Sequence, residues 1–150
     1  MTATTARRKL PEPTGTIEGR EMSERFNDAS IAEITAVLND YFDGLYDGDL
    51  EKFGRVFHPS SHLYATDGTN VTDMPRATYF EMIGGRASPR EQGLARHDRI
   101  LSIHKAGPNT AMATVNCAMP PRFFTDYLTL MRDADGWRII SKSFHTDVHE

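Results

Sequence analysis

The spacing of apolar residues changes once along the chain, and this change limits the possible folds more than any other feature. From Ser30 onwards apolar residues recur at steps of three and four, as on one face of a helix, at Ile31, Ile34, Leu38, Tyr41 and Leu45. In the last third they form four β-rich runs, HDRILSIH, TAMATVNCAM, RFFTDYLTLMR and WRIISKSFH, separated by KAGPN, PP and DADG. Helices followed by hairpin-linked strands predict an α+β domain. In such a domain a curved antiparallel sheet wraps the helices and leaves a concave interior.

Local signals place the ends of the first two helices. Ser30 and Glu33 form an S-x-x-E capping box at the start of the first helix, and Asp47-Gly48 ends it. Asp49 can cap a second helix, which Pro59 ends.

A third, shorter helix is predicted after one strand. SHLYAT and DGTN indicate a strand and its turn. In the segment that follows, Asp73 is expected to cap the helix, Pro75 to lie in its first turn, and Gly84-Gly85 to end it.

Length and composition exclude several classes of protein. A chain of 150 residues fits one domain, predicted at 28–150 after a flexible tail at 1–27 that shows no apolar period. The net charge of -4 comes from interspersed charges, so we expect no nucleic-acid partner. Cys117 is the only cysteine, which excludes an internal disulfide. No apolar run approaches the roughly 20 residues of a membrane span. We therefore expect a cytoplasmic protein without a membrane partner.

Two longer motifs resemble a known superfamily. YFDGLYDGDLEKFGRVFHP near the start and FTDYLTLMRDADGWRIISKSFH at the end resemble the nuclear transport factor two-like superfamily. The nearest subset is the one described as putative lumazine-binding or polyketide-cyclase-like, and the resemblance covers about residues 30–146. It implies a cone-shaped sheet around about three helices, with a pocket between them, and a homodimer formed through the open sheet face. Its members include isomerases, dehydratases, cyclases and non-catalytic binding modules, so the fold does not define the reaction.

The resemblance to ketosteroid isomerase is incomplete. The tyrosine that donates to the oxyanion in that enzyme falls on Tyr41, but the position of its base falls on Ala65 and that of its later acid falls near Thr129. That reaction is therefore not expected. Tyr41 is either a hydrogen-bond donor or a core residue of the amphipathic helix.

Scytalone dehydratase and a dehydrochlorinase suggest a different site. In both, an aspartate at the end of the first helix orients a histidine before the sheet, and these positions fall on Asp47 and His97. A carboxylate on one ring nitrogen raises the basicity of the other, which can then remove a proton. Alternatively, Asp47 is a turn residue and His97 faces solvent. A second histidine of scytalone dehydratase falls near Pro121, so another donor is needed, Tyr41 or Tyr64.

Further residues are candidates for contact with a substrate. His62 lies on the first predicted strand. Asp126 lies inside an apolar strand, where it either faces outward and bridges neighbouring strands or is paired in the pocket. Met112 and Phe80 can line a pocket for a flat apolar molecule or belong to an ordinary core.

The sequence thus favours a cofactor-independent lyase or isomerase that acts on a small molecule in a hydrophobic pocket. His97 is the predicted general base or acid, Asp47 its orienting residue, and Tyr41 or Tyr64 the donor. The alternative is a non-catalytic ligand-binding or dimerisation module. No nucleotide-binding or metal-binding motif is present, so no cofactor and no metal are expected.

Overall fold

The structure, a computed structural model, describes residues 28–149. The tail predicted at 1–27 lies outside these residues. The helices are α2 (Asp28–Asp47), α3 (Leu50–Val56) and α4 (Arg76–Gly84). The strands are β1 (Phe57–Thr66), β2 (Val71–Pro75), β3 (Arg99–Lys105), β4 (Thr110–Met119), β5 (Arg122–Asp133) and β6 (Gly136–Val148).

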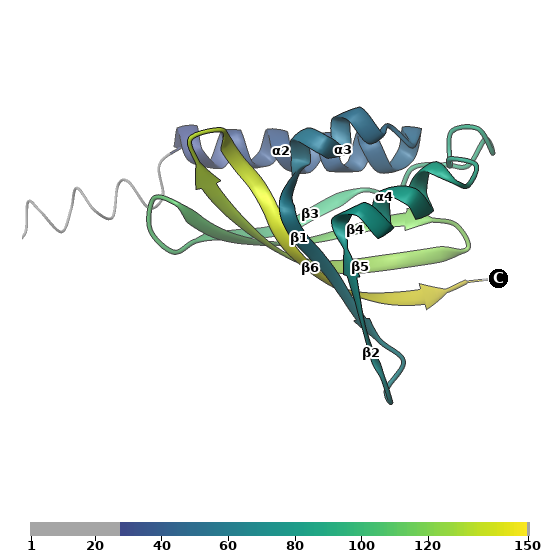
Figure 1. Ribbon diagram of the computed structural model, residues 1–150. Coiled ribbons are helices and arrows are strands. Elements are labelled where there is room, and N and C mark those ends of the chain that lie inside the picture. The colour runs from purple at the N-terminus through teal and green to yellow at the C-terminus, as the bar shows by residue number, and fades with distance from the viewer. Residues whose placement is uncertain (1–27, 150) are drawn as a thin grey trace, which may run out of the picture.

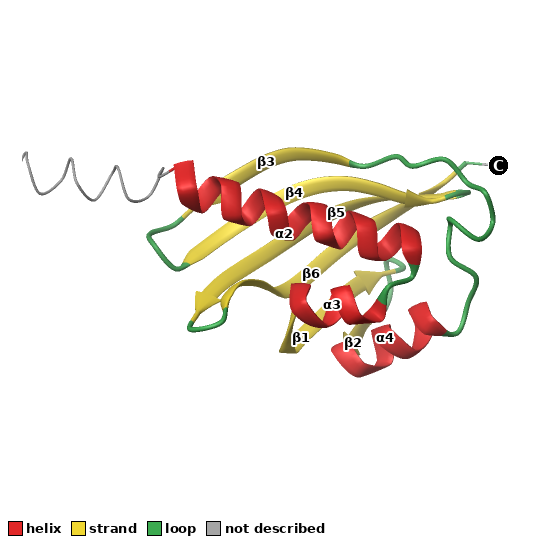
Figure 2. Ribbon diagram, turned by 90° about the horizontal axis from the view of Figure 1, so that it is seen from above, coloured by secondary structure: helices red, strands yellow, loops and turns green. Residues whose placement is uncertain are grey.

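All six strands form one curved, open sheet with the order β2-β1-β6-β5-β4-β3. Neighbouring strands are antiparallel except β1 and β6, which run parallel. After β2 at one edge of the sheet the chain passes to β3 at the opposite edge, and the antiparallel strands β3 to β6 then lead back to β1. Figure 1 shows the three helices on one side of the sheet, and Figure 2 shows α2 running obliquely across the strands. The predicted α+β fold, a curved sheet around three helices, is confirmed.

The core lies between the helices and the inner face of the sheet. The apolar face of α2, which carries Ile34, Leu38 and Tyr41, is fully buried, as the sequence period predicts. At the centre of the core four aromatic rings pack with centroids 5.2 to 6.0 Å apart, from Tyr41, Phe53, Phe57 and Tyr79. Each such side chain contributes about 1.5–3 kcal/mol on burial, so this cluster fixes α3 and α4 against α2.

Three local predictions are wrong. Ser30 does not cap α2, because the helix already begins at Asp28 and Ser30 lies within its first turn. Pro59 does not end α3: the helix ends at Val56, and Pro59 lies within β1. Proline has no backbone N–H to donate to a neighbouring strand. It is tolerated at this position because the regular pairing of β1 with β6 is interrupted between Phe57 and His62. Asp73 does not cap α4, because it belongs to β2 and pairs with Tyr64. The largely exposed β2 has no apolar alternation, so its residue pattern does not indicate a strand.

Among residues 28–149, no helix is long and apolar enough to cross a membrane.

Candidate functional site

The interior of the sheet holds a hydrogen-bonded group of charged and phenolic side chains. Tyr41 of α2 donates its hydroxyl to Oδ2 of Asp126 on β5 over 2.6 Å. Lys142 of β6 donates from Nζ to the Tyr41 hydroxyl oxygen over 2.5 Å, and its Nζ lies 3.8 Å from Asp126 Oδ2. All three side chains are buried. We call Tyr41, Asp126 and Lys142 the buried triad.

The triad is an ion pair bridged by a tyrosine. Asp126 faces the interior, so the outward-facing alternative from the sequence is wrong. Burial, the largest single influence, lowers the pKa of Lys142, but Asp126, Tyr79 and Cys117 together outweigh it, so the pKa is raised and Lys142 stays protonated. Burial, and then the charge of Asp126, raise the pKa of Tyr41 well above its usual value. The triad therefore offers hydrogen-bond donors and holds its protons.

The hydroxyl of Tyr79 and the thiol of Cys117 also make polar contacts with the triad. Lys142 also donates to the Tyr79 hydroxyl of α4, over 3.4 Å, and the thiol of Cys117 lies 3.5 Å from Asp126 Oδ2. Burial raises the pKa of the Cys117 thiol well above its usual value, and the Asp126 charge adds to this effect. Because the thiolate is the reactive form, Cys117 is unsuited to be a nucleophile.

A cleft of about 210 Å³ opens beside the triad, between α4 and the ends of β4, β5 and β6. Lys142 and Tyr79 reach its lining, whereas Tyr41 lies behind them. The walls are mostly apolar and include Leu45, Met74, Met82, Met119, Phe124 and Phe144. Arg86 and Arg122 complete the charged part of the lining, which contains no carboxylate and no histidine. We call this the interior cleft.

Sequence reasoning did not single out Lys142, Tyr79, Arg86 or Arg122. It did single out Phe80, which is partly buried, packs on Phe53 with ring centroids 5.9 Å apart, and lies under the guanidinium of Arg76. Phe80 thus packs beside the aromatic cluster and does not line the interior cleft.

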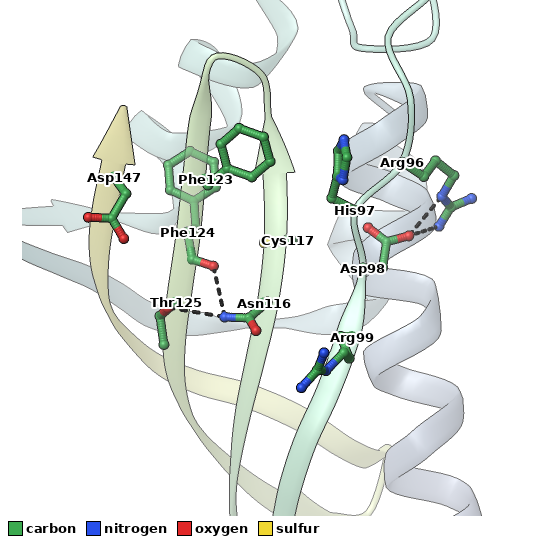
Figure 3. Close-up of a pocket in the computed structure, with 10 residues that line it drawn as sticks. All are labelled: Arg96, His97, Asp98, Arg99, Asn116, Cys117, Phe123, Phe124, Thr125 and Asp147. Atoms are coloured by element: carbon green, nitrogen blue, oxygen red, sulfur yellow. Dashed lines mark hydrogen bonds and ion pairs between the residues drawn. The ribbon is translucent and has the colours of Figure 1, made fainter. Parts of the chain in front are cut away.

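His97 lies in a different place, at the edge of the sheet before β3 begins. Its ring packs edge-on against Phe123, with centroids 5.1 Å apart, and lines an open pocket of about 420 Å³. Figure 3 shows this edge pocket, in which His97 faces the hairpin between β4 and β5, while Arg96 pairs with Asp98. Asn116 donates there to the Phe124 carbonyl and the Thr125 hydroxyl.

Asp47 is engaged elsewhere. Its carboxylate accepts a hydrogen bond from Nε of Arg90 at 2.5 Å. Within residues 28–149, no hydrogen bond or ion pair joins Asp47 to His97. The structure thus gives each member of the predicted dyad a different neighbour.

A histidine and a carboxylate do meet on the outer side of the sheet. Nδ1 of His62 lies 2.6 Å from Oδ1 of Asp73, and the His62 ring stacks on Tyr64 with centroids 6.1 Å apart. Tyr64 lines a small surface pocket with Ser143. Met112 also lies on the outer face, where it is 46% exposed. The predicted site residues His62, Tyr64 and Met112 therefore lie apart from Tyr41 and Asp126.

Three helices on a curved sheet that borders a cleft define a protein of the nuclear transport factor two-like superfamily. The model of the family described as putative lumazine-binding matches residues 29–145, and the chain belongs to that family. Both findings confirm the resemblance seen in the sequence.

Solved structures share this fold. An NTF2-like protein of unknown function from Silicibacter pomeroyi superposes with a TM-score of 0.71 at 22% identity, over 80% of this chain and 98% of that chain. A second, from Shewanella baltica, gives a TM-score of 0.73 at 22% identity, over 82% and 98%. The CaMKII hub of S. rosetta gives 0.57 at 11% identity, over 77% and 95%. At such identities the likeness concerns the fold alone. The comparison with curated proteins finds no match.

Proposed function

We propose that the protein binds a small, flat molecule, about the size of two fused rings, in the interior cleft. The observation that carries this proposal is the buried ammonium group of Lys142, which reaches the lining of a mainly apolar cleft together with the Tyr79 hydroxyl. Apolar walls with a few convergent polar groups are typical of small-molecule sites. Sulfur-rich walls from Met74, Met82 and Met119 suit a polarizable ring system.

Binding is favoured over proton abstraction in this cleft for a chemical reason. Its lining contains no aspartate, glutamate or histidine that could serve as a general base. The ammonium group of Lys142 and the hydroxyl of Tyr79 can instead donate to a carbonyl oxygen of the ligand. The description of the family as putative lumazine-binding supports this proposal, since lumazine is a flat bicyclic compound with ring carbonyls.

The test is direct titration of lumazine and of 2-naphthamide, a neutral two-ring probe, by isothermal calorimetry. Met82→Trp should fill the cleft and reduce the affinity for both probes at least about tenfold, because the indole occupies the ligand volume. The control is Leu101→Trp, which places the same indole on the exposed strand β3, outside the cleft, and should leave both affinities unchanged. If neither probe binds, or if binding survives Met82→Trp, the proposal is wrong.

A proton-transfer enzyme is the second candidate, and the position of His97 in the edge pocket favours it. A lyase or isomerase would use His97 as general base, with Asp47 released from Arg90 to orient the ring. The donors predicted from the sequence, Tyr64 and Tyr41, do not line the edge pocket, so the donor would come from another residue of its lining. Hydroxy-carbonyl substrates screened for elimination or isomerisation test this function. Activity that is abolished by His97→Gln supports it, and activity that survives this change excludes His97 as the base.

We also infer that the chain forms a homodimer through the outer face of the sheet, as the family resemblance implies. Neighbouring positions on this face of β4 and β5 expose Met112, Tyr127 and Met131. The residues between them on the same face, Thr114, Asn116, Thr125 and Thr129, are uncharged. Such a face can meet its own copy without repulsion between like charges.

A further inference from the structure

Two arginines line the interior cleft without a carboxylate partner. Within the described part of the chain, neither Arg86 nor Arg122 forms an ion pair, and the cleft lining contains no acidic residue. Arg86 donates a hydrogen bond from Nη2 to the sulfur of Met119, over 3.0 Å. A thioether is a weak acceptor. The Nε atom of Arg86 is buried and has no hydrogen-bond partner among residues 28–149.

Several other arginines donate to oxygen acceptors, although Nε of Arg138 is also buried without a partner among residues 28–149. Arg76 donates to the Phe57 carbonyl, Arg90 to Asp47, and Arg96 to Asp43 and Asp98. A buried N–H without an acceptor lowers stability, because it has lost its hydrogen bonds to water without gaining others. The hydrogen bonding of Arg86 within the protein is therefore unfavourable, and an oxyanion placed beside its guanidinium would relieve this.

The charges around Arg86 also favour an anion beside it. Burial lowers the pKa of the Arg86 guanidinium, Tyr79 opposes this shift, and the positive charge of Arg122 adds to it. Arg86 and Arg122 are thus close enough to repel each other. Like charges held together without a counterion are stabilised by an anion bound between them.

We infer that the ligand of the interior cleft is an acid, whose carboxylate binds Arg86 and Arg122 while its ring system lies against the methionine walls. This inference rests on the proposed binding function and specifies its ligand class. The planar guanidinium favours a planar carboxylate, with which it can form two parallel hydrogen bonds. Lys142 and Tyr79 remain available at the same cleft for a ring carbonyl or hydroxyl of this acid.

Two probes of nearly the same shape test the inference: 2-naphthoate, which is an anion at neutral pH, and 2-naphthamide, its neutral counterpart. Isothermal calorimetry with the full chain should give a preference for 2-naphthoate on the order of tenfold or more, since hydrogen bonds between charged groups are the stronger kind. Arg122→Gln and Arg86→Gln should each reduce this preference towards one while leaving 2-naphthamide affinity unchanged. The matched control is Arg55→Gln, an equal change of charge on an exposed part of α3, which should keep the preference.

The outcomes separate the two proposals. Binding of both probes with equal affinity, or a preference for 2-naphthoate that survives both cleft variants, overturns the acid inference and leaves the binding function standing. Absence of binding by both probes overturns both. If Arg86→Gln impairs folding, judged by its thermal unfolding, the exposed Arg122→Gln gives the decisive comparison.

Discussion

The Tyr41 hydroxyl donates to Asp126 over 2.6 Å and accepts from Lys142 over 2.5 Å, so a single tyrosine of the first described helix joins two buried charges on neighbouring strands. Burying either charge alone would be strongly unfavourable, because protein interiors solvate ions poorly. Tyr41 supplies a donor to one and an acceptor to the other. The triad thereby ties α2 to the centre of the sheet, directly behind the interior cleft.

Removing one member of the ion pair should be much worse than removing both. We expect Asp126→Leu or Lys142→Met alone to lower the free energy of unfolding by about 3–5 kcal/mol, since each leaves an uncompensated buried charge. The double variant should lose clearly less than the sum of the single losses. Urea unfolding of the four proteins measures this coupling. Additive losses would mean that the two charges do not interact.

Alkaline pH should destabilise the protein. The pKa of Lys142 is raised on folding, so its contribution is fully present below the unfolded-chain pKa of about 10.4 and is lost as the pH rises towards the folded value. Burial raises the pKa of Tyr41 in the same direction, so the unfolded chain also loses that proton first. Urea unfolding from about pH 8 to pH 11 should show a decline that is shallower in the Asp126→Leu, Lys142→Met double variant. An equal decline in both proteins would contradict the assignment.

Cys117 should react with a thiol reagent only when the sheet opens. It is 1% exposed, and burial raises its pKa, so both access and thiolate content are low. We expect labelling by a disulfide reagent at pH 8 to be on the order of 1,000-fold slower than in urea. Ser60→Cys in a Cys117→Ala background gives an exposed thiol for comparison and should react rapidly. Rapid labelling of native Cys117 would show that the core opens readily.

Two helical glycines should respond in opposite ways to alanine. A Cβ atom at Gly44 would lie 2.6 and 2.7 Å from ring carbons of Phe53, so Gly44→Ala overpacks the core and should lower stability by about 1–3 kcal/mol. At Gly54 the nearest atom would be Arg76 Nη2, at an ordinary 3.7 Å. Gly54→Ala should therefore raise stability by roughly 0.5–1 kcal/mol. Thermal unfolding of both variants measures the contrast, and a stabilising Gly44→Ala would refute the close packing of α2 on α3.

The proposed homodimer predicts a specific effect of charge on the outer face. The wild type should sediment as a dimer, and Tyr127→Glu should shift it to a monomer, because a buried glutamate would lack a partner. Leu50→Glu, on α3 and away from this face, is the control and should remain dimeric. A monomeric wild type at micromolar concentration would argue against the interface.

Much of the fold could be predicted because it follows from local patterns. The burial of Ile34, Leu38 and Tyr41 follows from their helical spacing, and the hairpins follow from strand runs divided by turn residues. The turn in which Asp67 accepts from the backbone of Thr69 and Asn70 is predicted by the sequence, but β2 after it is not, because its exposed residues show no apolar alternation.

The inward position of Lys142 could not be predicted from the sequence, because it depends on a bulge in β6. Leu130 pairs with Ile139 and Thr129 with Ser141, which leaves Ile140 as the extra residue of a bulge in β6. Counting by two from Ile139 would place Lys142 on the outer face, but the bulge reverses the alternation and turns it inward. Nothing in the local sequence marks this bulge.

The neighbours of Asp47 and His97 depend on long-range packing. Arg90, which pairs with Asp47, lies 43 positions further along the chain, in the segment between α4 and β3. A residue pattern around Asp47 contains no information about that partner. The edge pocket likewise depends on the pairing of β3 with β4. This pairing ends at Arg99 and Asn116, whereas β4 continues to Met119, so Cys117 has no partner residue on β3 and lines the pocket.

The parallel pairing of β1 with β6 affects how the chain can be made and shortened. The strand that comes last along the described residues, β6, lies inside the sheet, with β1 on one side and β5 on the other. During synthesis the hairpin of β1 and β2 therefore lacks its neighbouring strand until β6 has left the ribosome. A stop codon before Gly136 would leave two separate pieces of sheet, and would also delete Lys142 from the triad that both pieces need.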